Sequence, residues 1–162
     1  MRDRRDFVRA AVTALIGATI LPREGWALET LEQQPKNPRR RITVYKDPEC
    51  GCCKKWVELA NGTGWIVDVK DVDDINKIKT QLRVPKGLWS CHTAVVGRNV
   101  FEGHVPIDLM KSFMDRPRGV AGLAVPGMPV GSPGMEVPGR AADRYDVLGY
   151  FADGRTFVYA SR

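Results

Sequence analysis

The chain has 162 residues, 43% of them hydrophobic, and a formal net charge of +6. This composition supports a packed core, and the length fits one domain with additional segments. Part of the positive charge comes from arginines near the N-terminus, so the rest of the chain is only mildly basic. The one basic run, Arg39-Arg40-Arg41, has no interleaved aromatic residues and precedes a predicted strand, which argues against a nucleic-acid partner.

The N-terminal segment has the pattern of an export signal. Residues 4–9 resemble the twin-arginine signal, and an apolar run at 10–21, too short for a good transmembrane span, follows. We expect residues 1–27 to be removed and residues 28–41 to be a polar lead-in. The export route stays open, because Asp3 stands where the usual signal has Ser or Thr. Either route leads to an envelope compartment in which thiols meet oxidants, with no stable membrane span after processing.

Three of the four cysteines lie in one short stretch, Cys50-Gly51-Cys52-Cys53. An apolar run at 42–45 and a turn precede the stretch, and a helical pattern of apolar residues follows it. The thiols are therefore predicted on the first turn of a helix. Backbone N–H groups and the helix dipole favour thiolate there, and thiolate is the form that attacks disulfides and binds soft metals.

The spacing of these cysteines points to metal or redox chemistry. Cys50 and Cys53 form the C-x-x-C pair of thioredoxin-like redox proteins, which makes them candidate catalytic residues. On a helix, Cys52 points roughly 100° away from Cys53. Three crowded thiolates repel each other unless protons, a disulfide or cations neutralise them, and monovalent copper is a cation that thiolates select. A structural disulfide is the alternative, although disulfides that stabilise a fold usually join distant segments.

The remaining pattern predicts further strands and helices in alternation. Strands are expected at 65–69, 93–96 and 100–104, and helices at 72–82 and from Pro106 to Met114. With the first strand and helix, the order is β-α-β-α-β-β-α. This is the order of the thioredoxin fold, so we predict a thioredoxin-like α/β domain at 42–162.

In that fold, the segment before the third strand faces the C-x-x-C pair and usually contains a cis-proline. Here the segment has Cys91 and His92 at or next to that position and no proline. The fourth cysteine is therefore expected to meet the other three, with His92 as a second candidate metal ligand. His104, which precedes a predicted helix, is a candidate ligand or an ordinary polar residue.

A segment rich in Gly and Pro occupies residues 117–140, and an alternating pattern at 145–159 predicts a C-terminal hairpin. Within the segment, two Pro-Gly-Met units place Met128 and Met135 seven residues apart. A long loop is either functional or a linker. We predict that it folds back over the cysteines with Met128, Met135 or both reaching the metal, while packing residues remain the alternative.

Four motifs together resemble the CopG-type copper-resistance family. They are Cys50-Gly51-Cys52-Cys53, Ser90-Cys91-His92-Thr93, Glu102-Gly103-His104-Val105-Pro106 and Gly122-Leu123-Ala124-Val125-Pro126-Gly127-Met128. The resemblance implies a periplasmic, thioredoxin-like protein of copper detoxification that holds a polynuclear, cysteine-bridged copper cluster and has redox activity. It carries over Cys50, Cys52, Cys53 and Cys91 as the cluster thiolates.

Three classes of function remain open from the residues. The first is a Cu(I)-binding resistance protein that exchanges metal with other periplasmic copper-handling proteins. The second is a thiol–disulfide oxidoreductase in which Cys50 attacks and Cys53 resolves, although Cys52 and Cys91 are unusual in such an enzyme. The third is a structural zinc or disulfide domain. The chain lacks two separated C-x-x-C pairs, so zinc is less expected.

Overall fold

The structure is a computed structural model that describes residues 41–115 and 119–162. The predicted export signal at 1–27 and residues 28–40 of the lead-in lie outside the described residues. The elements in chain order are β1 (Arg41–Lys46), α1 (Gly51–Gly62), β2 (Ile66–Asp71), α2 (Ile75–Gln81), a 3₁₀ helix η2 (Lys86–Leu88), β3 (His92–Val96), β4 (Asn99–Glu102), α3 (Ile107–Met114), β5 (Val120–Ala124), β6 (Asp146–Phe151) and β7 (Thr156–Ser161). The predicted order of strands and helices is confirmed over residues 41–114.

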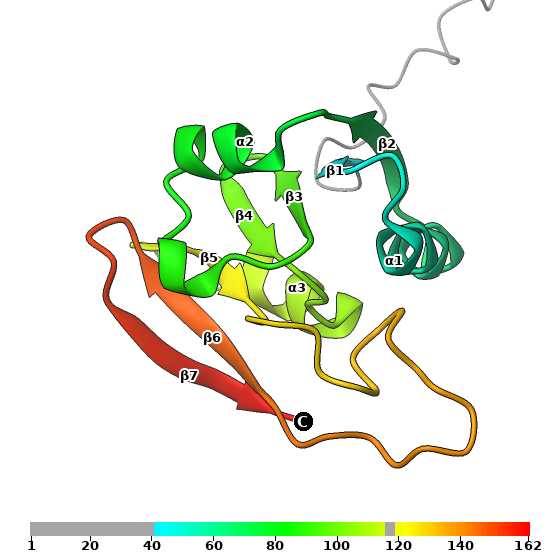
Figure 1. Cartoon of the computed structure of the whole chain (residues 1–162). Helices are drawn as coiled ribbons and strands as arrows, with labels where there is room; N and C mark the ends of the chain where they lie inside the picture. Colours follow the sequence, from blue (N-terminus) through cyan, green and yellow to red (C-terminus); the bar gives the residue numbers. More distant parts are fainter. Residues whose placement is uncertain (1–40, 116–118) are drawn as a thin grey trace, which may run out of the picture. The chain divides into compact units, whose positions relative to one another are not determined.

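The strands form one mixed sheet of seven in the order β2-β1-β3-β4-β5-β6-β7 (Figure 1). β1 pairs in parallel with β2 and antiparallel with β3, where Lys46 lies opposite His92. β4 pairs antiparallel with β3 and in parallel with β5. The C-terminal hairpin is confirmed as β6 and β7, which pair antiparallel at the end of the sheet.

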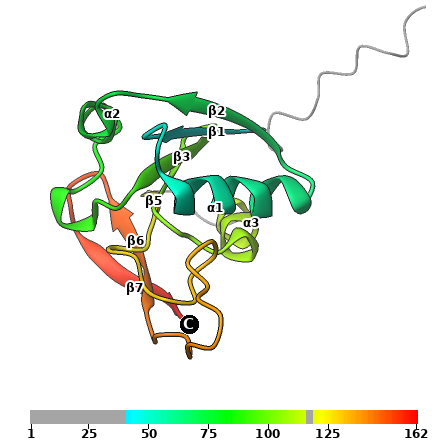
Figure 2. The ribbon, with the colours of Figure 1, turned by 45° about the vertical axis from the view of Figure 1, so that its right-hand side comes forward.

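Alternation along the strands separates two sets of apolar side chains on opposite faces of the sheet. Phe101 belongs to the larger cluster, which α1 and α3 cover, and Val100 belongs to the smaller one. Figure 2 shows α1 and α3 close together in front of the sheet, away from α2. The residues that α1 and α3 bury in the larger cluster are Trp56, Val57, Ala60, Ile107, Met110 and Phe113.

Helix α2 is shorter than the apolar spacing at 72–82 predicts. The side chain of Asp74 accepts hydrogen bonds from the backbone N–H groups of Asn76 and Lys77, at 3.1 and 3.3 Å. An aspartate that accepts in this way is an N-cap, so α2 begins at Ile75. None of the described helices is long and apolar enough to cross a membrane.

The structure differs from the sequence prediction within residues 117–140. Part of that Gly/Pro-rich segment forms β5, between β4 and β6. Gly122 permits this, since a Cβ at that position would collide with the Val100 carbonyl of β4. A glycine that looked like a loop residue thus allows two strands to approach. The chain between β5 and β6, residues 125–145, is the remaining loop, and we refer to it as the 125–145 loop.

Candidate metal centre

The first turn of α1 presents three cysteines, as predicted. Cys50 has an extended backbone at the N-cap, and its carbonyl accepts from the N–H of Lys54 at 3.2 Å. Cys50 and Cys53 form a disulfide, with their Cα atoms 5.3 Å apart. Cys53 is buried, whereas Cys50 and Cys52 are half-buried. The local helix geometry therefore joins the C-x-x-C pair and leaves Cys52 as a free thiol beside it.

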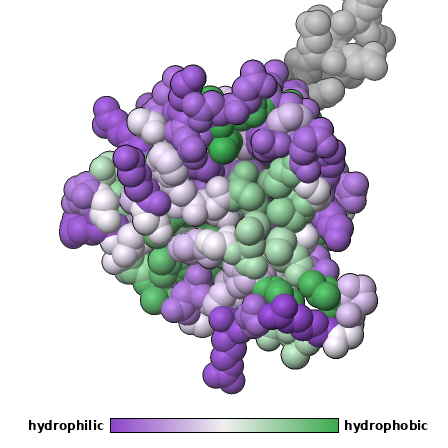
Figure 3. Space-filling view, in the orientation of Figure 1, coloured by the Kyte–Doolittle hydropathy of each residue, from purple (hydrophilic) through white to green (hydrophobic). Residues whose placement is uncertain are grey.

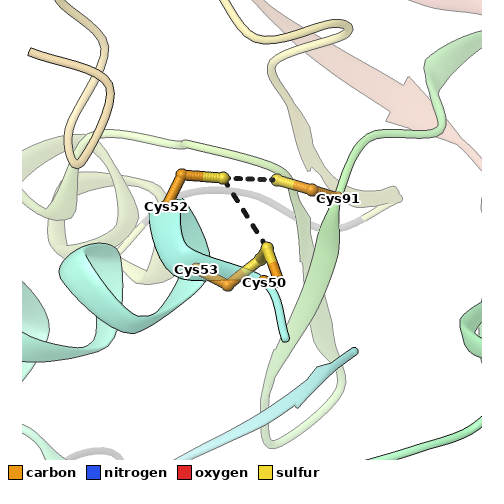
Figure 4. Close-up of side chains that lie close together, drawn as sticks. All are labelled: Cys50, Cys52, Cys53 and Cys91. Carbon is orange, nitrogen blue, oxygen red and sulfur yellow. Dashed lines mark hydrogen bonds between the residues drawn. A yellow bond between two sulfur atoms is a disulfide. The ribbon is translucent and has the colours of Figure 1, made fainter. Parts of the chain in front are cut away.

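Cys91 reaches the same site from a distant part of the sequence. It immediately precedes β3, and the pairing of β3 with β1 brings the end of β1 and the turn before α1 next to it. The Sγ of Cys52 lies 3.8 Å from the Sγ of Cys91 and 3.6 Å from that of Cys50 (Figure 4). The ligand atoms of all four cysteines lie within 4.8 Å of one another. The predicted meeting of the fourth cysteine with the other three is confirmed.

The four sulfurs suit soft metal ions once the disulfide is reduced. With the Cys50–Cys53 bond intact, the site offers two thiols, and with that bond reduced it offers four. Thiolates select Cu(I), Zn(II) and iron–sulfur clusters over hard cations. Sulfurs at this spacing can bridge neighbouring ions, so the donor set fits a bound soft metal.

The two histidines lie on the Cys91 side of the site. His104 Nε2 is 2.9 Å from the Sγ of Cys91, and His92 Nδ1 is 3.6 Å from the same sulfur. Because His104 Nδ1 faces the Pro133 carbonyl at 2.7 Å and donates to it, Nε2 is the unprotonated nitrogen and accepts from the Cys91 thiol. Cys91, His92 and His104 form a second group whose ligand atoms lie within 4.8 Å of one another.

Burial keeps the groups on this side neutral. Burial lowers the pKa of His104, and burial followed by the neighbouring His104 and Lys79 lowers that of His92. Burial, and then Cys52, raises the pKa of the Cys91 thiol to about 12. A metal that binds Cys91 must therefore displace a proton from it. Nε2 of His92 is buried and has no hydrogen-bond partner within the described part of the chain.

The 125–145 loop packs against the site. The hydroxyl of Ser90 donates to the Gly127 carbonyl at 2.6 Å, and Gly134 lies against the first turn of α1, beside Cys52 and Trp56. With the His104–Pro133 bond, these contacts show that the loop folds back to the cysteines, as predicted. Met128 is 55% exposed and Met135 is half-buried. Their roles as metal ligands stay predictions.

The face of the molecule seen in Figure 3 has an apolar centre. Pale green residues gather where α1 and the 125–145 loop meet in Figure 1, and hydrophilic residues surround them.

A buried polar network next to Cys91 escaped the sequence analysis. Glu102, at the end of β4, is fully buried and pairs with Lys79 of α2 at 2.5 Å. It also accepts from the Thr93 hydroxyl and from the backbone N–H of Ser90, each at 2.6 Å. A glutamate in a strand between apolar neighbours was the available signal, but only the fold shows that Lys79 is its partner.

Comparisons with known proteins agree with this geometry. The family described as "Protein of unknown function, DUF411" matches residues 88–135. Two solved structures, forms 1 and 2 of "Copper resistance protein copG", are each 40% identical to this chain with a TM-score of 0.71. Each match covers 75% of this chain, and 96% and 97% of the respective relatives. No curated protein matches the chain. The chain thus belongs to the family of the copper resistance protein CopG, as the four sequence motifs suggested.

Proposed function

We propose that this protein is a periplasmic copper-binding protein of copper resistance, with a thioredoxin-like domain that holds Cu(I) on Cys50, Cys52, Cys53 and Cys91. The observation that carries the proposal is the meeting of four sulfurs within 4.8 Å. The name of the structural relatives supports copper as the metal. The order of elements and the position of the C-x-x-C pair support the thioredoxin-like classification.

Charge balance favours more than one copper ion per chain. Four thiolates beside one Cu(I) would leave a net charge of −3 in a half-buried site. Bridging thiolates shared among several Cu(I) ions remove most of that charge, and soft sulfur ligands suit such bridges. His104, through its unprotonated Nε2, and His92 are neutral ligands that could complete the coordination without adding charge once Cys91 has lost its proton to the metal. The thioethers of Met128 and Met135 are neutral ligands too.

Loading this site is coupled to redox chemistry. Four thiolates form only when the Cys50–Cys53 disulfide takes up two electrons. A dithiol reductant can supply both electrons and become a disulfide itself. Two Cu(I) ions can also supply one electron each and leave as Cu(II). Either route breaks one S–S bond and forms two thiolates, so the copper content depends on the redox state of the compartment.

Copper stoichiometry tests the proposal. Reduced mature protein, titrated anaerobically with Cu(I), is expected to bind more than one copper per chain and to bind zinc less well. Cys52→Ser should lower the copper stoichiometry while the Cys50–Cys53 pair still oxidises. Ser112→Ala, on α3 and outside the site, is the matched control. A one-to-one copper complex that Cys52→Ser leaves unchanged would refute the bridged site.

The Cys50–Cys53 disulfide supports a second candidate function, thiol–disulfide exchange. Cys50 is half-buried and Cys53 is fully buried, so an external thiolate would reach Cys50. In the reduced form Cys50 would attack a substrate disulfide and Cys53 would resolve the mixed disulfide. Cys91→Ser separates the two functions, because an oxidoreductase keeps its turnover in that variant, whereas a copper site loses a ligand.

Location is the remaining part of the proposal. Export would place the site where copper-handling proteins of the periplasm could exchange metal with it. Mass spectrometry of the periplasmic fraction should find a mature chain that starts near Leu28. An intact N-terminus on a protein found only in the cytoplasm would contradict export.

A further inference from the structure

The buried pair Lys79–Glu102 contacts the backbone of Ser90, the residue immediately before the proposed copper ligand Cys91. Lys79 and Glu102 are 1% and 0% exposed. A buried ion pair is weak support for stability, because desolvation opposes the Coulomb attraction, and apolar replacements of both partners often stabilise a protein. Stability alone therefore does not account for the pair, and the other hydrogen bonds of the Glu102 carboxylate show what else it holds.

The carboxylate of Glu102 binds the chain segment that carries Cys91. One oxygen of the carboxylate, Oε1, accepts both from Lys79 Nζ, at 2.5 Å, and from the backbone N–H of Ser90, at 2.6 Å. Ser90 lies between η2 and β3, where no strand pairing holds the backbone. The bond to Glu102 thus fixes the Trp89–Ser90 peptide, one residue before Cys91.

Ser90 continues this connection to the loop above the cysteines. Its hydroxyl donates to the carbonyl of Gly127, the residue before the exposed Met128. It also lies 4.0 Å from the Sγ of Cys91. One residue therefore links the buried carboxylate, the Cys91 thiol and the 125–145 loop.

We propose that Glu102 is a positioning residue of the copper site: by accepting the N–H of Ser90, it holds the Cys91 sulfur opposite that of Cys52 and, through the Ser90 hydroxyl, holds the 125–145 loop over the thiols. This inference rests on the proposed function for its copper, but its geometry can be tested without copper. Lys79 neutralises the carboxylate and orients it, and Thr93 binds its second oxygen.

Two double variants isolate the bond to Ser90. Lys79→Met with Glu102→Gln removes both charges and keeps a side-chain oxygen for the Ser90 N–H. Lys79→Met with Glu102→Leu removes both charges and the acceptor. We expect the Leu double variant to lose Cu(I) to a chelator about tenfold faster than the Gln double variant, at a temperature well below both melting temperatures. A merely structural role would shift melting temperatures and leave these release rates equal.

A copper-free arm uses phenylarsine oxide, a soft reagent that bridges two thiols. With the Cys50–Cys53 disulfide intact, Cys52 and Cys91 are the two free thiols. We expect wild type and the Gln double variant to hold one arsenical per chain, and the Leu double variant to release it about tenfold faster. Wild-type protein that binds no copper would end the proposed function, and the arsenical rates would still decide the role of Glu102.

A single substitution tests the part of the proposal that concerns the loop. Ser90→Ala keeps the backbone N–H and removes the hydroxyl bond to Gly127. It should speed Cu(I) release about fivefold, and Ser112→Ala should not change it. If the two double variants release both copper and the arsenical at equal rates, the positioning role is wrong. If Ser90→Ala matches Ser112→Ala, the connection to the loop is wrong.

Discussion

The three cysteines at the start of α1 and the single cysteine before β3 reach one site by different means. Cys50 and Cys53 are three residues apart, and one helical turn is enough to join their sulfurs. Cys91 is 39 residues away from Cys52, and its position depends on the pairing of β1 with β3 and on the hydrogen bonds of Ser90.

The difference shows where the site is robust and where it is adjustable. The thiols of the first turn keep their spacing as long as α1 forms. The position of Cys91 depends on the buried Lys79–Glu102 pair and on the backbone at Ser90, which belongs to no strand. It also depends on the 125–145 loop, which packs against this side of the site. Changes in the tertiary contacts should therefore act first on Cys91 and leave the C-x-x-C pair intact.

The largest expected effect follows from breaking the buried ion pair. Glu102→Leu alone leaves the Lys79 ammonium buried without its anion, so we expect the free energy of unfolding to fall by about 3–5 kcal/mol. Denaturation of the metal-free protein measures it. The double variant with Lys79→Met should recover most of the loss. Equal stability of the single and the double variant would contradict this account of the pair.

Alkylation kinetics compare Cys91 with an ordinary thiol. A pKa of about 12 in place of 9.0 leaves roughly a thousandfold less thiolate at pH 8, and thiolate is the reactive form. In the metal-free protein, the alkylation rate of Cys91 should keep rising about tenfold per pH unit beyond pH 9, because its thiol stays mostly protonated until the pH approaches 12. The same shift lowers the stability of the folded state as the pH rises from 9.0 towards 12, because the unfolded chain releases this proton first.

The control is the same thiol in urea, where the rate should level off once the pH passes the ordinary pKa. Peptide mapping assigns the label to Cys91. A rate in the folded protein that levels off near pH 9 would show that burial does not protect the proton of this thiol.

A glycine of the loop tests the contact with α1. Gly134 has φ of +86°, and a Cβ there would approach Trp56 N at 2.9 Å and Cys52 O at 3.0 Å. Gly134→Ala should lower stability by about 1–3 kcal/mol through strain and this contact, and should speed the release of bound copper.

Gly139 provides a matched control for that substitution. It has φ of +78°, and a Cβ there would meet nothing within 4 Å. Gly139→Ala should therefore show the backbone strain alone, about 1–2 kcal/mol, with no change in copper release. If both variants release copper at the same rate, the loop does not hold metal through its contact with α1.

The smallest expected effect concerns the thioethers. Met128→Ala with Met135→Ala should weaken copper binding or speed copper loss by less than about tenfold, which corresponds to below 1.4 kcal/mol. Circular dichroism and thermal melting of the metal-free protein should stay unchanged, since Met128 is 55% exposed. Unchanged stoichiometry, affinity and release rate would restrict the site to cysteines and histidines.

The sequence by itself determined the elements with local causes. The apolar spacing around Trp56 predicted α1, and the Cys50–Cys53 spacing predicted a C-x-x-C pair with metal or redox chemistry on its first turn, with a structural disulfide as the alternative. The order of elements then predicted that Cys91 meets the other cysteines, and four short motifs indicated the CopG family. Each inference depends on neighbours in the chain or on a known order of elements, and both can be read without coordinates.

Only the tertiary structure decided the contacts between distant residues. The apolar pattern could not exclude that 120–124 belonged to a loop, because Gly122 becomes a strand residue only when β4 lies beside it. The helical spacing at 72–82 did not show that Lys79 is buried, because only the packing of α2 against β3 and β1 brings it to Glu102 of β4. The tautomer of His104 likewise depends on a carbonyl of Pro133, 29 residues away. Such pairings depend on how the chain packs in three dimensions, which residue types at a given spacing do not specify.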